Sequence, residues 1–477
     1  MPTGWNRVGH TASGRTPISS PARIAVCGPV PSEGGEARPV RPGEQRGPRK
    51  RPAECPRAPV RARPVHGRAR RTMIRMSDPQ VTYDDVVAAR ELLADVALRT
   101  PLLHSHVLSE IIGGPVHLKC ENLQRSGSFK IRGAYVRIAG LTGEERRRGV
   151  VAASAGNHAQ GVALASGLVG TGATVYMPRG APLPKVAATR SYGAEVLFAG
   201  DTVDVALERA REHANRTGAV FIHPFDHPDV VAGQGTIGLE IVDQLPEVGT
   251  IVMSLGGGGL AAGVALAVKS LRPGVRIVGV QAERAAAYPA SLAAGHPVQV
   301  RPASTMADGI AVGRPGELPF ELIHYLVDSV VTVTESQISQ ALVLCLERAK
   351  QVVEPAGVAG VAAILAHPQV FEPPVVAVLS GGNIDPLLLA KVLRHGLAAA
   401  GRYLTLRVPL SDRPGALAAL LSRLAELGAN VLDIVHERLG MHVGEVEVQL
   451  QLETKGPVHS EEVLGSLRVE GYKITVT

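Results

Sequence analysis

The chain has 477 residues, enough for two or three domains, and its hydrophobic fraction (45%) and charged fraction (19%) are typical of a globular protein. Its formal net charge of +7 is concentrated at one end, because residues 1–72 carry 15 Lys and Arg against 4 Glu, whereas the rest carries 35 basic and 39 acidic residues. This distribution argues against a nucleic-acid-binding surface on the folded part, and the lack of a long apolar run argues against a membrane protein.

Residues 1–76 are rich in Pro, Gly and Arg and have almost no apolar periodicity. Because such a segment buries too little apolar surface to offset chain entropy, we expect a disordered extension. A nucleic-acid arm and a targeting peptide are the alternatives, but the segment lacks both an amphipathic helix and the apolar stretch of a secretion signal. The favoured interpretation is a start codon assigned too early, with the chain beginning at Met73 or Met76.

Four cysteines occur in the chain, and two of them, Cys27 and Cys55, lie in this extension. The other two, Cys120 and Cys345, have no metal-type spacing and cannot form a disulfide framework. This usage predicts a reduced, cytoplasmic setting.

Residues 77–400 have the pattern of an α/β domain. Residues 82–98 have helical spacing with an acidic first turn. After them, helical segments alternate with short apolar runs, which are VVAAS, ATVYMP, EVLFAG, AVFIHP, TIVMSLG, RIVGVQ and PVVAVLS. Since strands buried on both faces are apolar throughout, the alternation predicts parallel sheets.

Residues 401–477 follow a different pattern and are predicted to form a second domain. RYLTLRVPL, ANVLDIVHERL, GEVEVQLQLE and YKITVT read as strands, and RPGALAALLSRLAELG and HSEEVLGSLRVEG read as helices. The resulting order βαββαβ is that of a ferredoxin-like module.

Three glycine-bearing loops follow predicted strands: SAGNHAQG (154–161), GGGGL (256–260) and SGGN (380–383). Ligands gather at the carboxyl ends of parallel strands, so these loops are expected to face one crevice. Consecutive glycines at a helix start let backbone N–H groups surround an anion, although the run has neither the Walker A nor the GxGxxG spacing. Together with Lys130 in ENLQRSGSFKIRGA, the loops suit a phosphorylated cofactor that uses a lysine, and pyridoxal 5'-phosphate fits.

The combination resembles a known family. KCENLQRSGSFKIRGA, SAGNHAQG, GGGGL, TMADGIAV, VVEPAGV and SGGNID occur in this order within residues 80–395 and are similar to the serine/threonine dehydratase family of fold-type II pyridoxal phosphate enzymes. The resemblance implies two subdomains with parallel sheets, like those of the tryptophan synthase β subunit. DRPGALA followed by GANV resembles the amino-acid-sensing ACT domain.

The resemblance also implies roles for individual residues. Lys130 would bond covalently to the cofactor and then act as the base at the substrate Cα. Phe129 would pack beside the cofactor, Asn157 would bond its ring hydroxyl, and Ser380 would contact its pyridine nitrogen. The other implied residues are a phosphate-binding group, Gly256, Gly257, Gly258, Gly259 and Leu260, and a substrate-binding group, Ser154, Ala155, Gly156, Asn157 and His158. His158 could equally be a packing residue, and Glu354 and Asp308 could be ordinary ion-pair or capping residues.

The implied reaction is β-elimination of L-threonine to 2-oxobutanoate and ammonia, with L-serine as a secondary substrate. A serine hydroxyl at the pyridine nitrogen stabilises a protonated ring less than a carboxylate would, which favours elimination over transamination. A serine dehydratase, another amino-acid eliminase and an inactive amino-acid-binding regulator remain alternatives. Isoleucine biosynthesis and threonine catabolism are both compatible with the sequence.

Two departures from the racemase branch of the family bear on this reaction. That branch has a second serine, an acid/base for the opposite face of the substrate, where this chain has Ala155. It also has metal-binding carboxylates where this chain has Gln281 and Ala287, so we predict no divalent cation there, although Glu283 lies close.

In the C-terminal module, Asp412 precedes a turn into a helix whose N–H groups suit an amino-acid carboxylate, with Asn430 placed to contact the ligand. Isoleucine or valine is the expected effector, and a homodimer or homotetramer is the expected assembly.

Overall fold

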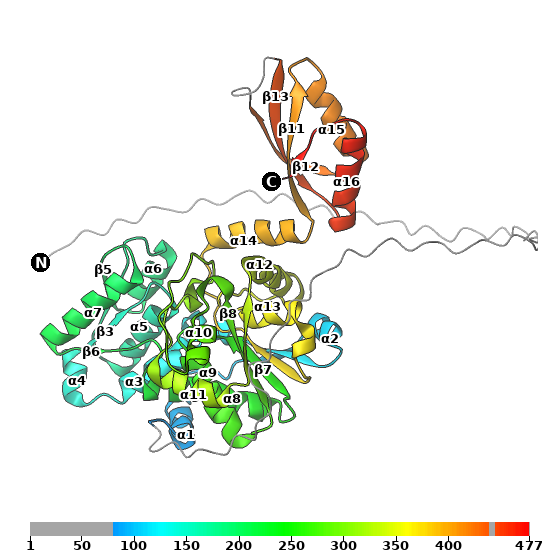
Figure 1. Ribbon diagram of the computed structural model, residues 1–477. Helices are drawn as coiled ribbons and strands as arrows, with labels where there is room; N and C mark the ends of the chain where they lie inside the picture. The colour runs from blue at the N-terminus through cyan, green and yellow to red at the C-terminus, as the bar shows by residue number, and fades with distance from the viewer. Residues whose placement is uncertain (1–79, 438–443, 477) are drawn as a thin grey trace, which may run out of the picture. The chain divides into compact units, whose positions relative to one another are not determined.

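The structure is a computed structural model that describes residues 80–437 and 444–476 (Figure 1). The extension predicted for residues 1–76 lies outside the described residues and stays a prediction. In the described part, no helix combines the length and the apolar character needed to cross a membrane.

The first sheet has six strands in the order β1-β2-β10-β7-β8-β9. Their bounds are β1 Leu102–His104, β2 Val116–Lys119, β10 Val375–Val378, β7 Thr250–Ser254, β8 Arg276–Ala282 and β9 Ser329–Val333. All neighbours are parallel except β1 and β2. The central strands β7 and β10 are buried along their whole length, which explains why they are almost wholly apolar.

The second sheet has four parallel strands in the order β5-β4-β3-β6. They are β3 Val150–Ala153, β4 Ala173–Met177, β5 Glu195–Phe198 and β6 Val220–Phe221. The chain leaves the first sheet after β2, builds the whole second sheet, and returns at β7 (Figure 1). A sheet that is parallel except for β1, and a second sheet that is wholly parallel, both covered by helices, confirm the predicted two-subdomain α/β fold.

Helices cover both sheets. They are α1 Tyr83–Leu92, α2 His106–Ile112, α3 Lys130–Ala139, α4 Gly143–Arg148, α5 Asn157–Val169, α6 Leu183–Ser191, α7 Val203–Thr217, α8 Pro228–Gln244, α9 Gly259–Leu271, α10 Ala287–Ala294, α11 Glu317–Leu326, α12 Glu335–Leu344, α13 Ala359–Ala366 and α14 Pro386–Ala399. Short helical turns are η1 Glu121–Leu123, η2 Arg125–Gly127, η3 Glu283–Ala285, η4 Asp308–Ile310, the π-helical η5 Cys345–Ala349 and η6 Pro368–Val370. Several starts are capped as their sequences predict, as in α1, where Thr82 and Asp85 form a capping box.

The helix expected over residues 82–98 is shorter in the structure. It ends at Leu92, and hydrogen-bonded turns continue the chain, with the N–H groups of Val96 and Ala97 donating to the Leu93 carbonyl. Leu93 and Val96 are both buried. The apolar residues whose spacing suggested a longer helix are therefore buried by turns after Leu92 instead.

The C-terminal module has its own four-stranded antiparallel sheet, in the order β12-β13-β11-β14. Its elements are β11 Tyr403–Ser411, α15 Ala416–Glu426, β12 Asn430–Glu437, β13 Glu445–Glu453, α16 Pro457–Val469 and β14 Thr475–Val476. β11 and β13 alternate between buried and exposed residues, and the buried ones form a separate core with α15 and α16. The predicted βαββαβ order is confirmed for the described residues.

Candidate active site

A cavity of about 610 Å³ lies where β3, β7 and β10 end. Every residue that the sequence assigned to the cofactor or the substrate lines it, namely Phe129, Lys130, Ser154, Ala155, Gly156, Asn157, His158, Gly256, Gly257, Gly258, Gly259, Leu260 and Ser380. These residues come from segments up to about 250 positions apart, so the fold alone brings them together. The three glycine-bearing loops share one crevice because the carboxyl ends of parallel strands meet at one edge of a sheet.

Lys130 is the first residue of α3, and its Nζ donates to the carbonyl oxygen of Pro224 at 3.0 Å. Burial lowers the pKa of this lysine to about 8, against the opposing effect of the Glu354 charge. The ammonium also lies 5.1 Å from the centre of the Phe129 ring. A lysine that loses its proton near neutral pH can act as a nucleophile and as a base.

Two residues further along α3, Arg132 fixes the position of the helix. Its guanidinium donates to both carboxylate oxygens of buried Glu121 (2.9 and 2.8 Å) and to Glu240 at 2.7 Å. Lys119, at the end of β2, binds the other oxygen of Glu240 at 2.5 Å. The charges of this buried cluster balance, so it ties α3 to β2 and α8 without leaving an unpaired ion.

The loop Gly256–Gly259 needs glycine because other parts of the protein approach it closely. A Cβ at Gly257 would lie 2.3 Å from the Phe225 ring, and one at Gly258, where φ is +108°, would lie 2.0 Å from the Tyr288 hydroxyl. α9 begins at Gly259, so the N–H groups of its first turn have no acceptor within the helix. Such N–H groups at the start of a 13-residue helix form an anion-binding site.

His158 lines the cavity and is also a packing residue, so both interpretations of it hold in part. Its Nε2 donates to the carbonyl of Ile222 at 2.9 Å, and burial, helped by the Lys130 charge, lowers its pKa to about 3. His158 is therefore neutral at physiological pH. In the same loop the N–H of Gly156 donates to the Ser154 hydroxyl at 3.1 Å.

Four further side chains bear on the site. Glu354 and Asp308, whose roles the sequence left open, both line the cavity, and so does Lys185. Lys185 and Asp308 form an ion pair of 3.0 Å, while Glu354 and Asn383 hydrogen-bond to the two ends of the Asn157 amide. Lys185 and Asn383 were missed as site residues, although Asn383 belongs to the SGGN motif in which only Ser380 received a role.

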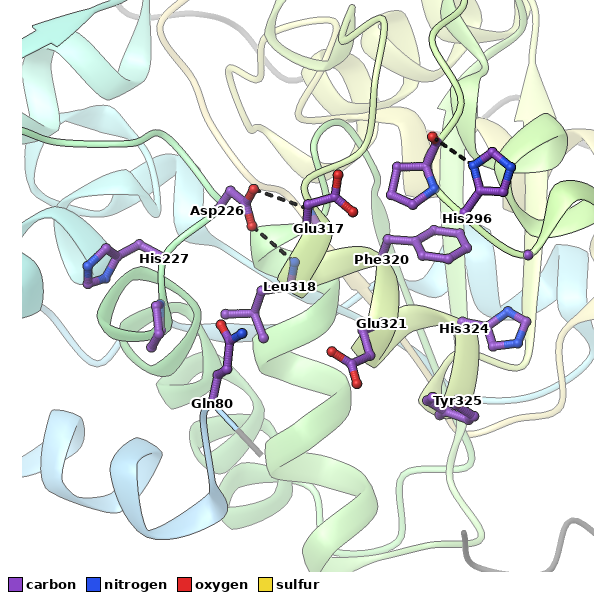
Figure 2. Close-up of a pocket in the computed structure, with 13 residues that line it drawn as sticks. Gln80, Asp226, His227, His296, Glu317, Leu318, Phe320, Glu321, His324 and Tyr325 are labelled. Atoms are coloured by element: carbon purple, nitrogen blue, oxygen red, sulfur yellow. Dashed lines mark hydrogen bonds between the residues drawn. The ribbon is translucent and has the colours of Figure 1, made fainter. Parts of the chain in front are cut away.

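A second cavity, of about 570 Å³, lies beside α11 and contains none of the predicted site residues (Figure 2). Asp226 lines both cavities, and its carboxylate caps α11 by accepting the N–H groups of Glu317 and Leu318, each at 3.1 Å. Gly316, the residue before α11, donates its N–H to the Gly257 carbonyl at 3.1 Å. The Asp226 cap at the start of α11 therefore helps to hold the glycine loop Gly256–Gly259 in place.

At the position of a metal-binding carboxylate in the racemase branch, Gln281 Oε1 accepts the N–H of Tyr288 at 2.8 Å. Within residues 80–437 and 444–476, no group of three or more His, Cys, Asp or Glu residues is placed to hold a metal ion. The expectation of no divalent cation stays a prediction.

The residues of the cavity fit pyridoxal phosphate. A lysine of lowered pKa suits its aldehyde, the glycine loop at the α9 N-terminus suits its phosphate, and the Ser380 hydroxyl and the Asn157 amide can bond its ring. Two parallel sheets around such a cavity define a pyridoxal phosphate enzyme of fold-type II.

Comparison with known proteins gives the same class. Residues 93–381 match the family described as pyridoxal-phosphate dependent enzyme, so this chain belongs to that family. It is 49% identical to an L-threonine ammonia-lyase of Thermotoga maritima over 398 residues, which is 83% of this chain and 99% of that protein. It is 47% identical to an L-threonine ammonia-lyase of Geobacter sulfurreducens over 83% of this chain and 99% of that protein.

This chain is also similar to solved structures of pyridoxal phosphate enzymes. A threonine deaminase from tomato, Solanum lycopersicum, in its processed form, is 38% identical with a TM-score of 0.63, covering 67% of this chain and 95% of that one. A serine racemase from maize is 34% identical with a TM-score of 0.63, covering 67% of this chain and 98% of that one. The resemblance of residues 80–395 to the serine/threonine dehydratase family and the pyridoxal phosphate cofactor are confirmed.

Proposed function

We propose that this protein converts L-threonine to 2-oxobutanoate and ammonia by β-elimination, with L-serine as a secondary substrate. The observation that carries the proposal is the placement of Lys130, the glycine loop and Ser380 around one cavity. Its support from relatives is the 49% identity to a protein named L-threonine ammonia-lyase over almost that protein's whole length.

Three groups of residues would hold the cofactor. Lys130 would bond to it covalently, the N–H groups of Gly256–Leu260 would bind its phosphate, and Asn157, Phe129 and Ser380 would contact its ring. When bound, pyridoxal phosphate supplies an electron sink that acidifies the Cα–H bond of an amino acid.

Once the substrate amino group has displaced it from the cofactor, Lys130 would be a free amine and would act as the base. Because burial lowers the pKa of this lysine to about 8, a useful fraction of it is unprotonated near neutral pH and can accept the proton from Cα. The loop Ser154–His158 would bind the substrate carboxylate through backbone N–H groups at the start of α5. As the proton leaves Cα, hydroxide leaves Cβ, and the unsaturated product hydrolyses to the oxoacid and ammonia.

Ala155 favours elimination over racemisation, the reaction named for the maize relative. A racemase needs an acid/base on each face of Cα, and an alanine side chain cannot carry a proton. Ala155→Ser should therefore allow D-serine to form from L-serine. Chiral chromatography that finds no D-serine would show that this residue does not restrict the reaction.

Residues 77–400 would form the catalytic domain, and residues 401–477 a regulatory ACT domain for a branched-chain amino acid. A cavity of about 280 Å³ in the module is lined by Leu410, Ser411, Asp412, Arg413, Pro414, Ala416, Leu417, His436 and Val446, which supports an effector site near the turn before α15. Asn430, predicted to contact the effector, does not line it, and its amide donates to Glu453 at 3.3 Å. The effector contacts would therefore come from the turn and from His436.

A homodimer or homotetramer is supported by the edge strand β12. This strand has a neighbour on one side only in the described sheet, and its Leu432, Ile434 and Val435 are exposed. An exposed apolar edge strand is a surface that proteins normally cover.

A substrate panel tests the proposed function. We expect oxoacid release from L-threonine at the highest kcat/KM, weaker release from L-serine, and a shift of the threonine saturation curve by isoleucine or valine that is lost on deletion of residues 402–477. An enzyme that prefers serine, or that releases no oxoacid from either substrate, would contradict the proposal.

A further inference from the structure

The amide of Asn157 is held at both ends by side chains from elsewhere in the chain. Its Oδ1 accepts a hydrogen bond from Asn383 Nδ2 at 2.8 Å, and its Nδ2 donates to Glu354 Oε1 at 2.5 Å. Asn383 Nδ2 also donates to the backbone carbonyl of Ser126 at 2.6 Å. These hydrogen bonds form a chain from Ser126 through Asn383 and Asn157 to Glu354.

The donor and acceptor directions in this series of hydrogen bonds are set by its two ends, Ser126 and Glu354. A backbone carbonyl can only accept, so the side of Asn383 that faces Ser126 must be its NH₂ group. That NH₂ group then has one hydrogen left for Asn157, whose facing atom must therefore be its carbonyl oxygen. At the far end, an ionised Glu354 also only accepts, which requires the Asn157 NH₂ group there.

We infer that Asn383 and Glu354 are positioning residues, which fix the Asn157 amide so that one of its N–H bonds stays available as a donor in the cavity. The inference rests on the proposed function, because that donor is the group expected to bond the ring oxygen of the cofactor. A reversed amide would present its carbonyl oxygen instead, and two oxygens would then repel.

The surrounding backbone is shaped around these side chains. A Cβ at Gly381 would lie 2.4 Å from Glu354 Oε1 and 2.9 Å from Asn157 Nδ2, and a Cβ at Gly127 would lie 2.2 Å from Asn383 Oδ1. Ser126 adopts a φ of 62°, which is rare for a residue other than glycine. Strained backbone of this kind is found where a particular geometry is required, and here it lies four residues before Lys130.

The series of hydrogen bonds from Ser126 to Glu354 also joins the segments that carry the other site residues. Ser126 belongs to η2, shortly before Lys130, Asn157 starts α5, and Asn383 follows Ser380 after β10. Backbone hydrogen bonds support the same junction, from Gly382 N to the Gly127 carbonyl at 2.8 Å and from Glu354 N to the Gly381 carbonyl at 2.9 Å. A change at Asn383 should thus act on the cofactor through Asn157, without a contact of its own.

Glu354 adds a dependence on pH. Burial raises the pKa of its carboxyl to about 7, helped by the Asp308 charge and opposed by the charges of Lys185 and Lys130 and by the hydrogen bond from Asn157. Above that pH the carboxylate can only accept from Asn157, whereas below it the protonated carboxyl can also donate, so that Asn383 alone still fixes the amide. The affinity for pyridoxal phosphate should therefore fall as pH decreases through about 7.

Asn383→Asp tests the inference, because aspartate has the same shape but cannot donate to Asn157 or Ser126. The matched control is Asn122→Asp, since the NH₂ group of Asn122 also donates to two acceptors, Gln351 and Val352, but Asn122 does not line the cavity; Asn122 is buried, whereas Asn383 is half-buried. The probe is pyridoxal phosphate itself, titrated into cofactor-stripped protein and followed by its absorbance.

We expect the Kd for pyridoxal phosphate to rise about 10- to 100-fold in Asn383→Asp, as when a side chain that orients a ligand group is lost, with a shifted absorbance maximum. Asn122→Asp should change neither quantity. An unchanged Kd and spectrum in Asn383→Asp, or equal changes in both variants, would overturn the inference. These readouts do not depend on threonine turnover, so failure of the proposed function would be seen separately in the oxoacid assay.

If Asn383→Asp does not fold, Glu354 provides a second test. Glu354→Gln, whose amide can donate as well as accept, should bind pyridoxal phosphate at every pH as the unchanged protein does below pH 7, and so should lose the pH dependence. Glu354→Leu should weaken the binding of pyridoxal phosphate at every pH. The inference is wrong if both variants bind the cofactor as the unchanged protein does and keep its pH dependence.

Discussion

Lys185 Nζ lies 3.0 Å from Asp308 Oδ2, in an ion pair that joins α6 of the second sheet to η4 beside the first. The Lys185 side chain is only 10% exposed, whereas that of Asp308 is 55% exposed. A Cβ at Gly156 would lie 3.8 Å from the same ammonium. A second cation therefore stands next to the loop expected to hold the substrate carboxylate, and it links the two walls of the cavity.

Lys185→Gln should raise the KM for L-threonine about tenfold with a smaller effect on kcat, because a nearby charge that attracts the carboxylate acts mainly on binding and about 1.4 kcal/mol corresponds to a factor of ten. The measurement is steady-state oxoacid release. Arg179→Gln is the control, since Arg179 pairs with Asp201 at 3.7 Å in a largely solvated setting. A KM that is unchanged in Lys185→Gln would assign the ion pair a purely structural role.

Gly258→Ala should abolish tight binding of pyridoxal phosphate. The backbone there has a φ of +108°, and the new methyl group would meet the Tyr288 hydroxyl at 2.0 Å, so the loop must shift away from its present shape. Equilibrium dialysis of the cofactor measures the loss. Gly274→Ala, beyond the far end of the same helix with no atom within 4 Å of the added Cβ, should bind normally; equal loss in both would refute the argument.

The stability of the catalytic domain should decrease as pH falls below about 6.5, in part because of His158. Its pKa is lowered to about 3 in the folded protein from an ordinary value of 6.5, so only the unfolded chain takes up the proton between these values. One proton corresponds to about 1.4 kcal/mol of unfolding free energy per pH unit. Urea unfolding between pH 6.5 and 4.5 measures the slope.

His158→Gln should reduce the slope of unfolding free energy against pH by about 1.4 kcal/mol per pH unit, the contribution of one proton, whatever its effect on stability at neutral pH. His395→Gln, a change at an exposed histidine of α14, should leave the slope as it is. The same slope in all three proteins would mean that His158 is charged in the folded state.

Much of the fold was predictable because its strands are apolar throughout. The seven apolar runs became β3, β4, β5, β6, β7, β8 and β10. β1 and β9 were not predicted as strands. β1 has only three residues and is mostly exposed, and β9 is half-buried at the sheet edge, so neither shows the apolar run of a central strand.

The cavity-lining residues were predictable where they lie in glycine-bearing loops after strands. Lys185 and Asn383 were not, because each gains its importance from a partner more than 120 positions away in the sequence. Asp308 and Glu354 could not be distinguished from ordinary carboxylates for the same reason. Local sequence shows which reactive and polar side chains are present. The contacts that orient those side chains come from residues far away in the sequence and are formed only in the folded protein.

The central claim is that Lys130, and not the other cavity lysine, Lys185, bonds to the cofactor. Borohydride reduction of the protein loaded with pyridoxal phosphate, followed by proteolysis and mass spectrometry, tests it directly. We predict that the mass of the reduced cofactor is found on the peptide containing Lys130, and that Lys130→Ala loses both this label and oxoacid release. A label on Lys185, or a Lys130→Ala variant that still releases 2-oxobutanoate, would contradict the claim.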